Sequence, residues 1–132
     1  TFTVPGTKIR FACAKAVAPI LVSFAKDFHD LVEPIDEGQL DDWGYAFRQT
    51  RGSNKILSNH ASGTAIDLNA IKHPLGKSNT FNKDQRNTIN LLITKYGLTW
   101  GGNYKRRKDD MHFEIALDRD EVKQKIEQLG LK

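Results

Sequence analysis

Two short segments of the sequence carry side chains that could hold a metal ion. Residues 58–67 read Ser-Asn-His-Ala-Ser-Gly-Thr-Ala-Ile-Asp, and residues 109–114 read Asp-Asp-Met-His-Phe-Glu. Together they offer the imidazoles of His60 and His112 and the carboxylate of Asp67. Catalytic zinc sites use such a set of three protein ligands and keep one position open for water. The two segments therefore predict a Zn²⁺ site held by these three residues.

Alternating apolar and polar residues predict that these ligands lie on strands, in which successive side chains point to opposite faces. In residues 65–69, Asp67 has the opposite parity to the isoleucine and leucine beside it. In residues 111–117, His112 and Glu114 would point to one face of a strand, and the large apolar side chains would point to the other. Each strand is thus expected to present one apolar face and one polar face.

Three helices are predicted where apolar residues recur at steps of three and four. They are expected over residues 12–32, 82–96 and 120–129, and a glycine stands directly after each of the last two as a natural helix stop. Pro19 falls inside the first pattern, so that helix is expected to start or kink there. Residues 98–102 are expected to form a short strand and a turn.

A third alternating run spans residues 43–48. As a strand, it would place three aromatic side chains on one face and Arg48 on the other. With the two strands and the helices above, this pattern predicts an α+β fold. We expect a small antiparallel sheet with helices mainly on one face and a zinc cleft on the other. At 132 residues the whole chain, 1–132, is expected to form a single domain.

The motif Ser-x-His-x-x-Gly-x-Ala-x-Asp followed by a late Asp-x-x-His resembles a known family. It is similar to the zinc D-alanyl-D-alanine carboxypeptidases and L-alanyl-D-glutamate endopeptidases of bacterial cell-wall metabolism, including the peptidase modules of phage endolysins. The resemblance covers roughly residues 43–114. It implies a metallopeptidase that hydrolyses the stem peptide of bacterial peptidoglycan with bound Zn²⁺.

The resemblance alone leaves the bond that is cut undecided between two branches of the family. The short chain, the Trp-Gly-Gly turn at residues 100–102 and the Asp-x-x-His-Phe-Glu ending favour an L-alanyl-D-glutamate endopeptidase of a phage endolysin. The Arg-Gly-Ser and Asp-Leu-Asn surroundings fit a D-alanyl-D-alanine carboxypeptidase about equally well. A hedgehog-like binding module, which has a similar zinc scaffold without peptidase activity, is a third alternative.

Three acids beside the second histidine compete for the role of general base. The resemblance selects Asp109, which matches the acid three residues before that histidine. Strand parity favours Glu114 instead, because it shares a face with His112, although this position also suits a partner that holds the ring. Asp110 is the third candidate.

A cation beside the metal would stabilise the negative charge that develops on the carbonyl oxygen during hydrolysis. The resemblance points to an arginine on the strand before the motif, and Arg48 is the expected counterpart. Arg51 is the competing choice.

Composition narrows the remaining classes of function. The net charge of +4 suits an anionic polymer such as the bacterial wall. The basic cluster at residues 105–108 lacks the interleaved aromatic residues of a single-strand groove, so no nucleic-acid partner is expected. No run of apolar residues is long enough to span a membrane. We expect a monomer that acts at the bacterial wall, on the periplasmic or extracellular side, although no signal peptide is visible.

Several other polar or aromatic residues have a plainer expected role. Cys13 is expected to be a buried, inert thiol, and the sequence offers no second cysteine for a disulfide. His29 is expected to cap a helix or face solvent, and His73 to be an ordinary hydrogen-bonded group. Trp100 and Ser58 could contribute to the cleft or to the frame around it.

Overall fold

The computed structural model describes residues 2–36, 64–74, 76–77, 80–104 and 108–131. The strand predicted over residues 43–49, together with Arg48, Arg51, Ser58 and His60, lies outside these residues. In chain order the elements are β1 (Phe2–Thr3), β2 (Arg10–Phe11), the 3₁₀ helix η1 (Lys15–Val17), α1 (Ala18–Leu31), β3 (Ala65–Asp67), α2 (Lys83–Tyr96), β4 (Leu98–Trp100), the 3₁₀ helix η2 (Gly101–Asn103), β5 (His112–Ile115) and α3 (Arg119–Leu129).

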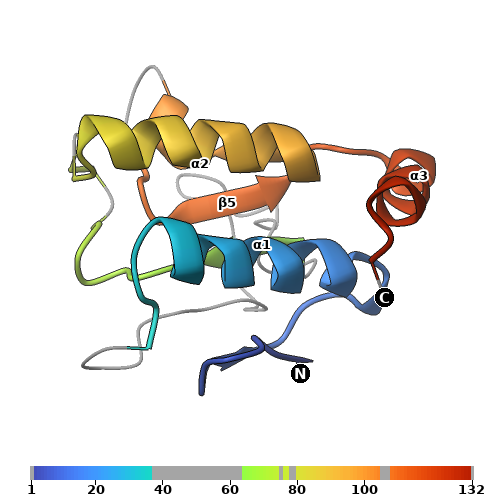
Figure 1. Ribbon diagram of the computed structural model, residues 1–132. Coiled ribbons are helices and arrows are strands. Elements are labelled where there is room, and N and C mark those ends of the chain that lie inside the picture. Colours follow the sequence, from blue (N-terminus) through green and yellow to red (C-terminus); the bar gives the residue numbers. More distant parts are fainter. Residues whose placement is uncertain (1, 37–63, 75, 78–79, 105–107, 132) are drawn as a thin grey trace, which may run out of the picture.

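The central element is a three-stranded antiparallel sheet in the order β3-β5-β4. Helices α1 and α2 run side by side across one face of this sheet, and α3 lies beyond its end (Figure 1). A second, two-stranded ribbon pairs β1 with β2 near the N-terminus. The predicted α+β class, with a small antiparallel sheet and helices mainly on one face, is confirmed.

Phe113, in the middle of β5, anchors the sheet to the helices. Its side chain is fully buried, and its ring centroid lies 4.8 Å from that of Phe24 and 5.7 Å from that of Phe28, both on α1. The Trp100 ring stacks on Phe113 from β4 at 6.2 Å. Trp100 therefore belongs to the core. Of the two roles predicted from the sequence, this agrees with a place in the frame and not with the wall of a cleft. Burying Phe113 turns its neighbours in the strand, His112 and Glu114, to the opposite face.

The helix boundaries follow local capping signals. α1 begins at Ala18, with Pro19 in its first turn, where the missing proline N–H has no helical partner to lose. The predicted start at residue 12 was therefore too early, and the alternative that the helix starts at the proline is confirmed. α2 begins after a capping box made by Asn82 and Gln85, and it ends at Gly97, whose φ is 73°.

None of the helices among the described residues combines the length and the apolar character needed to cross a membrane.

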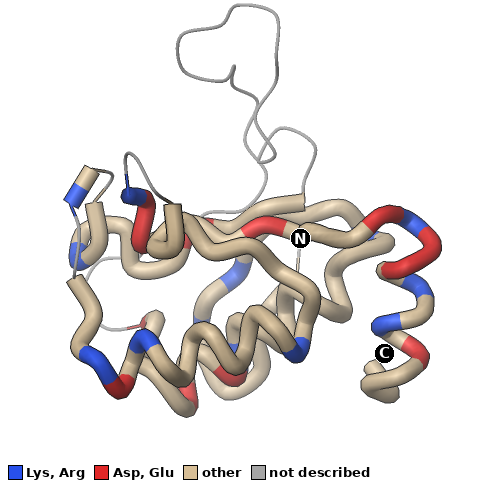
Figure 2. Tube along the Cα trace, turned by 90° about the horizontal axis from the view of Figure 1, so that it is seen from above, with Lys and Arg blue, Asp and Glu red and all other residues tan. Residues whose placement is uncertain are grey.

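Charges of both signs are mixed along α3, the element near the C-terminus in Figure 2. Its N-cap is Asp118, whose side chain accepts from the amide of Glu121 at 2.8 Å. Only Val122 of this helix is buried, so most of α3 faces solvent.

A buried polar network joins the segment after β3 to the segment before β5. Its centre is His73, 2% exposed, whose Nε2 contacts Glu33 and whose Nδ1 lies 2.6 Å from Thr80 Oγ1. The Asp110 carboxylate accepts from both the amide and the hydroxyl of Thr80, and Asn69 Nδ2 donates to Glu33 Oε1 at 2.9 Å. The expectation that His73 is an ordinary hydrogen-bonded group is confirmed, and the network fixes the two segments that flank the predicted ligands.

Two minor expectations can also be checked. His29 Nδ1 accepts from the amide of Ile35 at 3.1 Å, so its ring holds the chain just beyond the end of α1. Cys13 is partly buried, and burial raises the pKa of its thiol to about 11. Little thiolate forms at neutral pH, which agrees with an inert thiol.

The polar network predicts a specific loss of stability in acid. Burial alone would raise the pKa of Glu33, but hydrogen bonds from His73 and Asn69 outweigh it and hold the pKa below its usual value. An acid whose pKa falls on folding stabilises the protein above its unfolded pKa of about 4.3, and this contribution is lost as pH falls through the folded pKa. We expect Glu33→Gln to lower the free energy of unfolding at pH 7 by about 1–3 kcal/mol. In the variant, the free energy of unfolding should also fall less steeply as the pH drops below ~4.3.

Urea unfolding at a series of pH values from 7 to 3 measures both effects. Glu127→Gln, an exposed acid on α3, is the matched control and should follow the wild-type curve. Equal acid limbs for Glu33→Gln and wild type would contradict the role given to this network.

Candidate metal centre

Asp67 and His112 lie directly opposite each other in the β3–β5 ladder. Asp67 Oδ1 is 3.1 Å from His112 Nδ1, and their side chains are 2% and 12% exposed. Both face away from the layer of Phe113 and the helices because each strand alternates. The structure thus brings together two of the three predicted ligands, from segments far apart in the sequence.

This pair suits a shared cation. A deprotonated Nδ1 and a carboxylate oxygen are both acceptors, so at 3.1 Å they require either a proton or a positive ion between them. Zinc bonds of about 2.0–2.2 Å in a tetrahedral arrangement place two ligand atoms roughly 3.3 Å apart. The observed separation is close to that value, and the donor types are ones that zinc accepts.

The surroundings of His112 favour a proton at this position. Burial works against a charged His112 ring, but hydrogen bonds with Asp67 and Glu114, together with the charges of Asp67 and Asp109, raise the pKa of His112 to about 9. The same negative surroundings that hold the proton would attract a divalent cation. Metal binding at this position must therefore displace a proton.

The third predicted ligand, His60, lies outside the described residues, as do Arg48 and Arg51. Among the described residues, no group of three or more potential ligands forms a metal site. Glu114 does not complete the pair, because its carboxylate contacts the other edge of the His112 ring, at Nε2, with Oε1 3.1 Å away. The structure thus contains a two-residue half-site.

Tyr104 is a member of the site that the sequence analysis missed. Its hydroxyl donates to Glu114 Oε1 at 3.1 Å. Burial and the charge of Glu114 raise the pKa of Tyr104 well above its usual value, so the hydroxyl stays protonated and remains a donor. Tyr104 belongs to no strand, and neither periodicity nor spacing in the sequence marks it.

The three candidate bases occupy different environments. Asp110 is fully buried, and one of its carboxylate oxygens is hydrogen bonded to Thr80 within the polar network. Glu114 is engaged by His112 and Tyr104. Asp109 is half-buried, and its charge contributes to the raised pKa of both His112 and Tyr104.

A close approach of two backbone segments sets the position of Asp109. Its amide donates to the carbonyl of Gly101 at 3.1 Å, and its own carbonyl accepts from the amide of His112 at 3.0 Å. A Cβ at residue 101 would lie 2.1 Å from the Asp109 carbonyl oxygen. Only glycine fits this position without displacing the segment that carries the acid.

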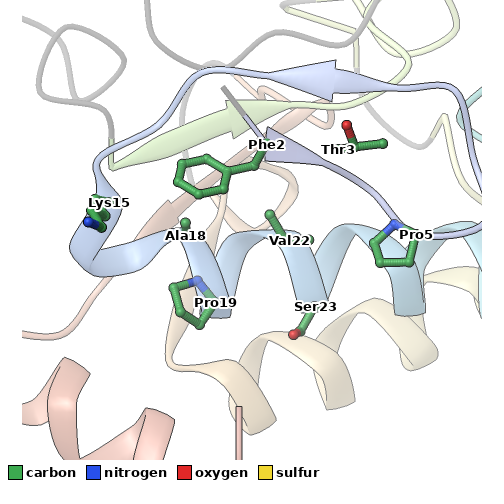
Figure 3. A pocket seen from close by; sticks show the side chains of 8 residues that line it. All are labelled: Phe2, Thr3, Pro5, Lys15, Ala18, Pro19, Val22 and Ser23. Atoms are coloured by element: carbon green, nitrogen blue, oxygen red, sulfur yellow. The ribbon is translucent and has the colours of Figure 1, made fainter. Parts of the chain in front are cut away.

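A separate pocket lies between β1 and the first turns of α1 (Figure 3). Phe2 on β1 and Pro19 and Val22 on α1 contribute its apolar lining, and Lys15 is the charged residue among the eight that line it. Those residues include no acid and no histidine, so the pocket offers neither the metal ligands nor the general base that hydrolysis requires.

A buried aspartate and a histidine are paired across an antiparallel sheet, and an acid stands three residues before the histidine. Residues 51–115 match the family model described as D-alanyl-D-alanine carboxypeptidase, over just under half of the 132 residues. This segment includes Asp67, Asp109 and His112, and the match supports a relationship to this family of peptidases. Searches of curated proteins and of solved structures returned no match.

The contact at Gly101 makes a testable prediction about Asp109. In Gly101→Ala the new methyl group collides with the Asp109 carbonyl, so the segment must shift, at a cost of about 1–3 kcal/mol in the free energy of unfolding. Gly130→Ala is the control, because it strains a left-handed residue at the end of α3 with no atom within 4 Å of the new Cβ.

Urea unfolding and hydrolysis assays on both variants separate the two effects. We expect Gly101→Ala to lose activity by at least tenfold under conditions where it is folded, and Gly130→Ala to lose only stability. Full activity in folded Gly101→Ala would show that the position of Asp109 does not matter.

Proposed function

We propose that this protein is a zinc-dependent peptidase that hydrolyses the stem peptide of bacterial peptidoglycan. The observation that carries the proposal is the pairing of Asp67 Oδ1 with His112 Nδ1 at 3.1 Å on the polar face of the sheet. The family match supports peptide hydrolysis as the reaction. The net charge of +4 favours attraction to the anionic wall.

In this proposal His60, Asp67 and His112 hold the zinc ion. Zinc at this position supplies Lewis-acid activation of water and of the scissile carbonyl. The negative charges around His112 favour a cation, since they already hold a proton on the ring in its absence. Asp67, buried and fixed in the β3–β5 ladder, keeps its carboxylate in place for that ion.

Asp109 is the proposed general base and acid. It takes a proton from the attacking water and returns a proton to the leaving amine, which is the role that a carboxylate beside the metal performs in such a reaction. The structure supports this choice, because Asp110 is buried against Thr80 and Glu114 is occupied by His112 and Tyr104. Arg48 is proposed to stabilise the negative charge on the carbonyl oxygen.

The proposed bond is the one between L-alanine and D-glutamate, cut by an endopeptidase of the phage-endolysin type. The Trp-Gly-Gly segment at residues 100–102 and the Asp-x-x-His-Phe-Glu ending support this branch. The description of the matched family favours a second candidate, removal of the terminal D-alanine by a carboxypeptidase. In both cases the protein acts at the bacterial wall, and we propose that it does so as a monomer.

Digestion of purified peptidoglycan followed by mass spectrometry tests the proposal and separates the candidates. The endopeptidase releases fragments with a new N-terminal D-glutamate, whereas the carboxypeptidase releases free D-alanine. A chelator should abolish either activity, and added Zn²⁺ should restore it. Binding to the wall without any hydrolysis would instead indicate a hedgehog-like binding module, and the peptidase proposal would fail.

The role of Asp109 predicts a separation of metal binding from catalysis. Asp109→Asn keeps the size of the side chain but cannot accept the proton of water, so we expect the variant to bind one Zn²⁺ and lose about 10²–10⁴-fold in kcat. Asp120→Asn, on the exposed surface of α3, is the control and should be fully active.

Zinc content by elemental analysis and kcat on a soluble stem peptide are the two measurements. Undiminished kcat in Asp109→Asn would move the base to another acid.

A further inference from the structure

The His112 ring is held at both of its nitrogen atoms. Nδ1 faces Asp67 Oδ1, and Nε2 faces Glu114 Oε1, each at 3.1 Å. Glu114 is two residues along β5 and therefore shares a face with His112. The two carboxylates thus lie at opposite edges of one imidazole.

With a metal ion bound beside Asp67, the contact at Nε2 decides where the single proton of the neutral ring lies. An ionised carboxylate only accepts hydrogen bonds, so Glu114 requires the proton to be on Nε2. A neutral imidazole carries a single N–H, and the lone pair then belongs to Nδ1, the atom that faces Asp67. Glu114 thereby selects the form of His112 whose free lone pair points to the proposed zinc position.

Tyr104 holds the Glu114 carboxylate from a second direction. Its hydroxyl donates to the same oxygen, Oε1, at 3.1 Å. Tyr104 follows η2, and Glu114 lies on β5, so the two groups reach this point from different segments. The carboxylate is 21% exposed and has a fixed orientation, which suits a group that orients a ligand.

We infer that Glu114, fixed by Tyr104, is a positioning residue that sets the proton arrangement and ring orientation of His112 for metal binding through Nδ1. This inference rests on the proposed zinc site and adds two residues to it. It also assigns Glu114 a function other than that of the general base.

Zinc affinity is the direct readout, measured by competition with a chromophoric chelator. Removing a carboxylate that orients a metal-bound histidine costs about 10–100-fold in metal affinity, and we expect this loss for Glu114→Ala. Glu114→Gln keeps an oxygen that can accept from Nε2–H, so most of the affinity should return. Tyr104→Phe should weaken binding by less than Glu114→Ala, and Glu127→Ala on α3 should bind like wild type.

A second readout reports the ring itself. In ¹⁵N–¹H correlation spectra of the zinc-loaded wild type, we expect the His112 ring proton on Nε2 and none on Nδ1. In zinc-loaded Glu114→Ala, we expect the His112 ring proton to be no longer confined to Nε2. Should Glu114→Ala fail to fold, Tyr104→Phe decides the question by the same two measurements.

The possible failures are distinguishable. If wild type binds zinc and Asp67→Ala does not, while Glu114→Ala, Glu114→Gln and Tyr104→Phe all bind it as tightly as wild type, the positioning role is overturned and the proposed function stands. If wild type itself binds no zinc, the proposed function fails and the inference fails with it. A proton on Nδ1 in the zinc-loaded wild type would also overturn the inference.

Discussion

The antiparallel pairing of β3 with β5, in one particular register, is the constraint on which the site depends. This register sets Asp67 opposite His112 and, one position along, Ile66 opposite Phe113. A slip of one residue would turn a whole strand over and send its polar side chains into the core. Burial of Phe113 and Ile66 opposes such a slip, because both are fully buried in the layer between sheet and helices. Hydrophobic packing on one face therefore fixes the polar chemistry on the other.

The loops beside these strands are held by more specific means than packing. His73 and Thr80 connect Glu33, at the end of α1, to Asp110, directly before the segment that enters β5. Gly101 lets the backbone of Asp109 approach closely. Such contacts require individual hydrogen-bonding groups and one residue without a side chain, so they fix orientation more than they add buried apolar area. The result is that the three acids Asp109, Asp110 and Glu114 have different surroundings.

Alternation in the sequence was sufficient to predict which residues share a face. It correctly placed Asp67 and His112 together, Phe113 in the core, and Glu114 beside His112, because a strand has a period of two whatever surrounds it. Residues outside regular elements follow no such period. The contact of Tyr104 with Glu114 and the network around His73 therefore could not be predicted from the sequence. The first helix was predicted too long for a related reason, since apolar spacing continues past the point where Pro19 sets the start. The assignments of His60 and Arg48 remain predictions, because both lie outside the described residues.

The most direct test of the central claim is diffraction from crystals grown with zinc, with data collected on both sides of the zinc absorption edge. The account predicts one anomalous peak bonded to His112 Nδ1 and to a carboxylate oxygen of Asp67, with the remaining ligands completing a tetrahedron. The imidazole of His60 should be among them. A peak bonded to His112 Nε2, or the absence of any peak between Asp67 and His112 in crystals soaked with excess zinc, would contradict it.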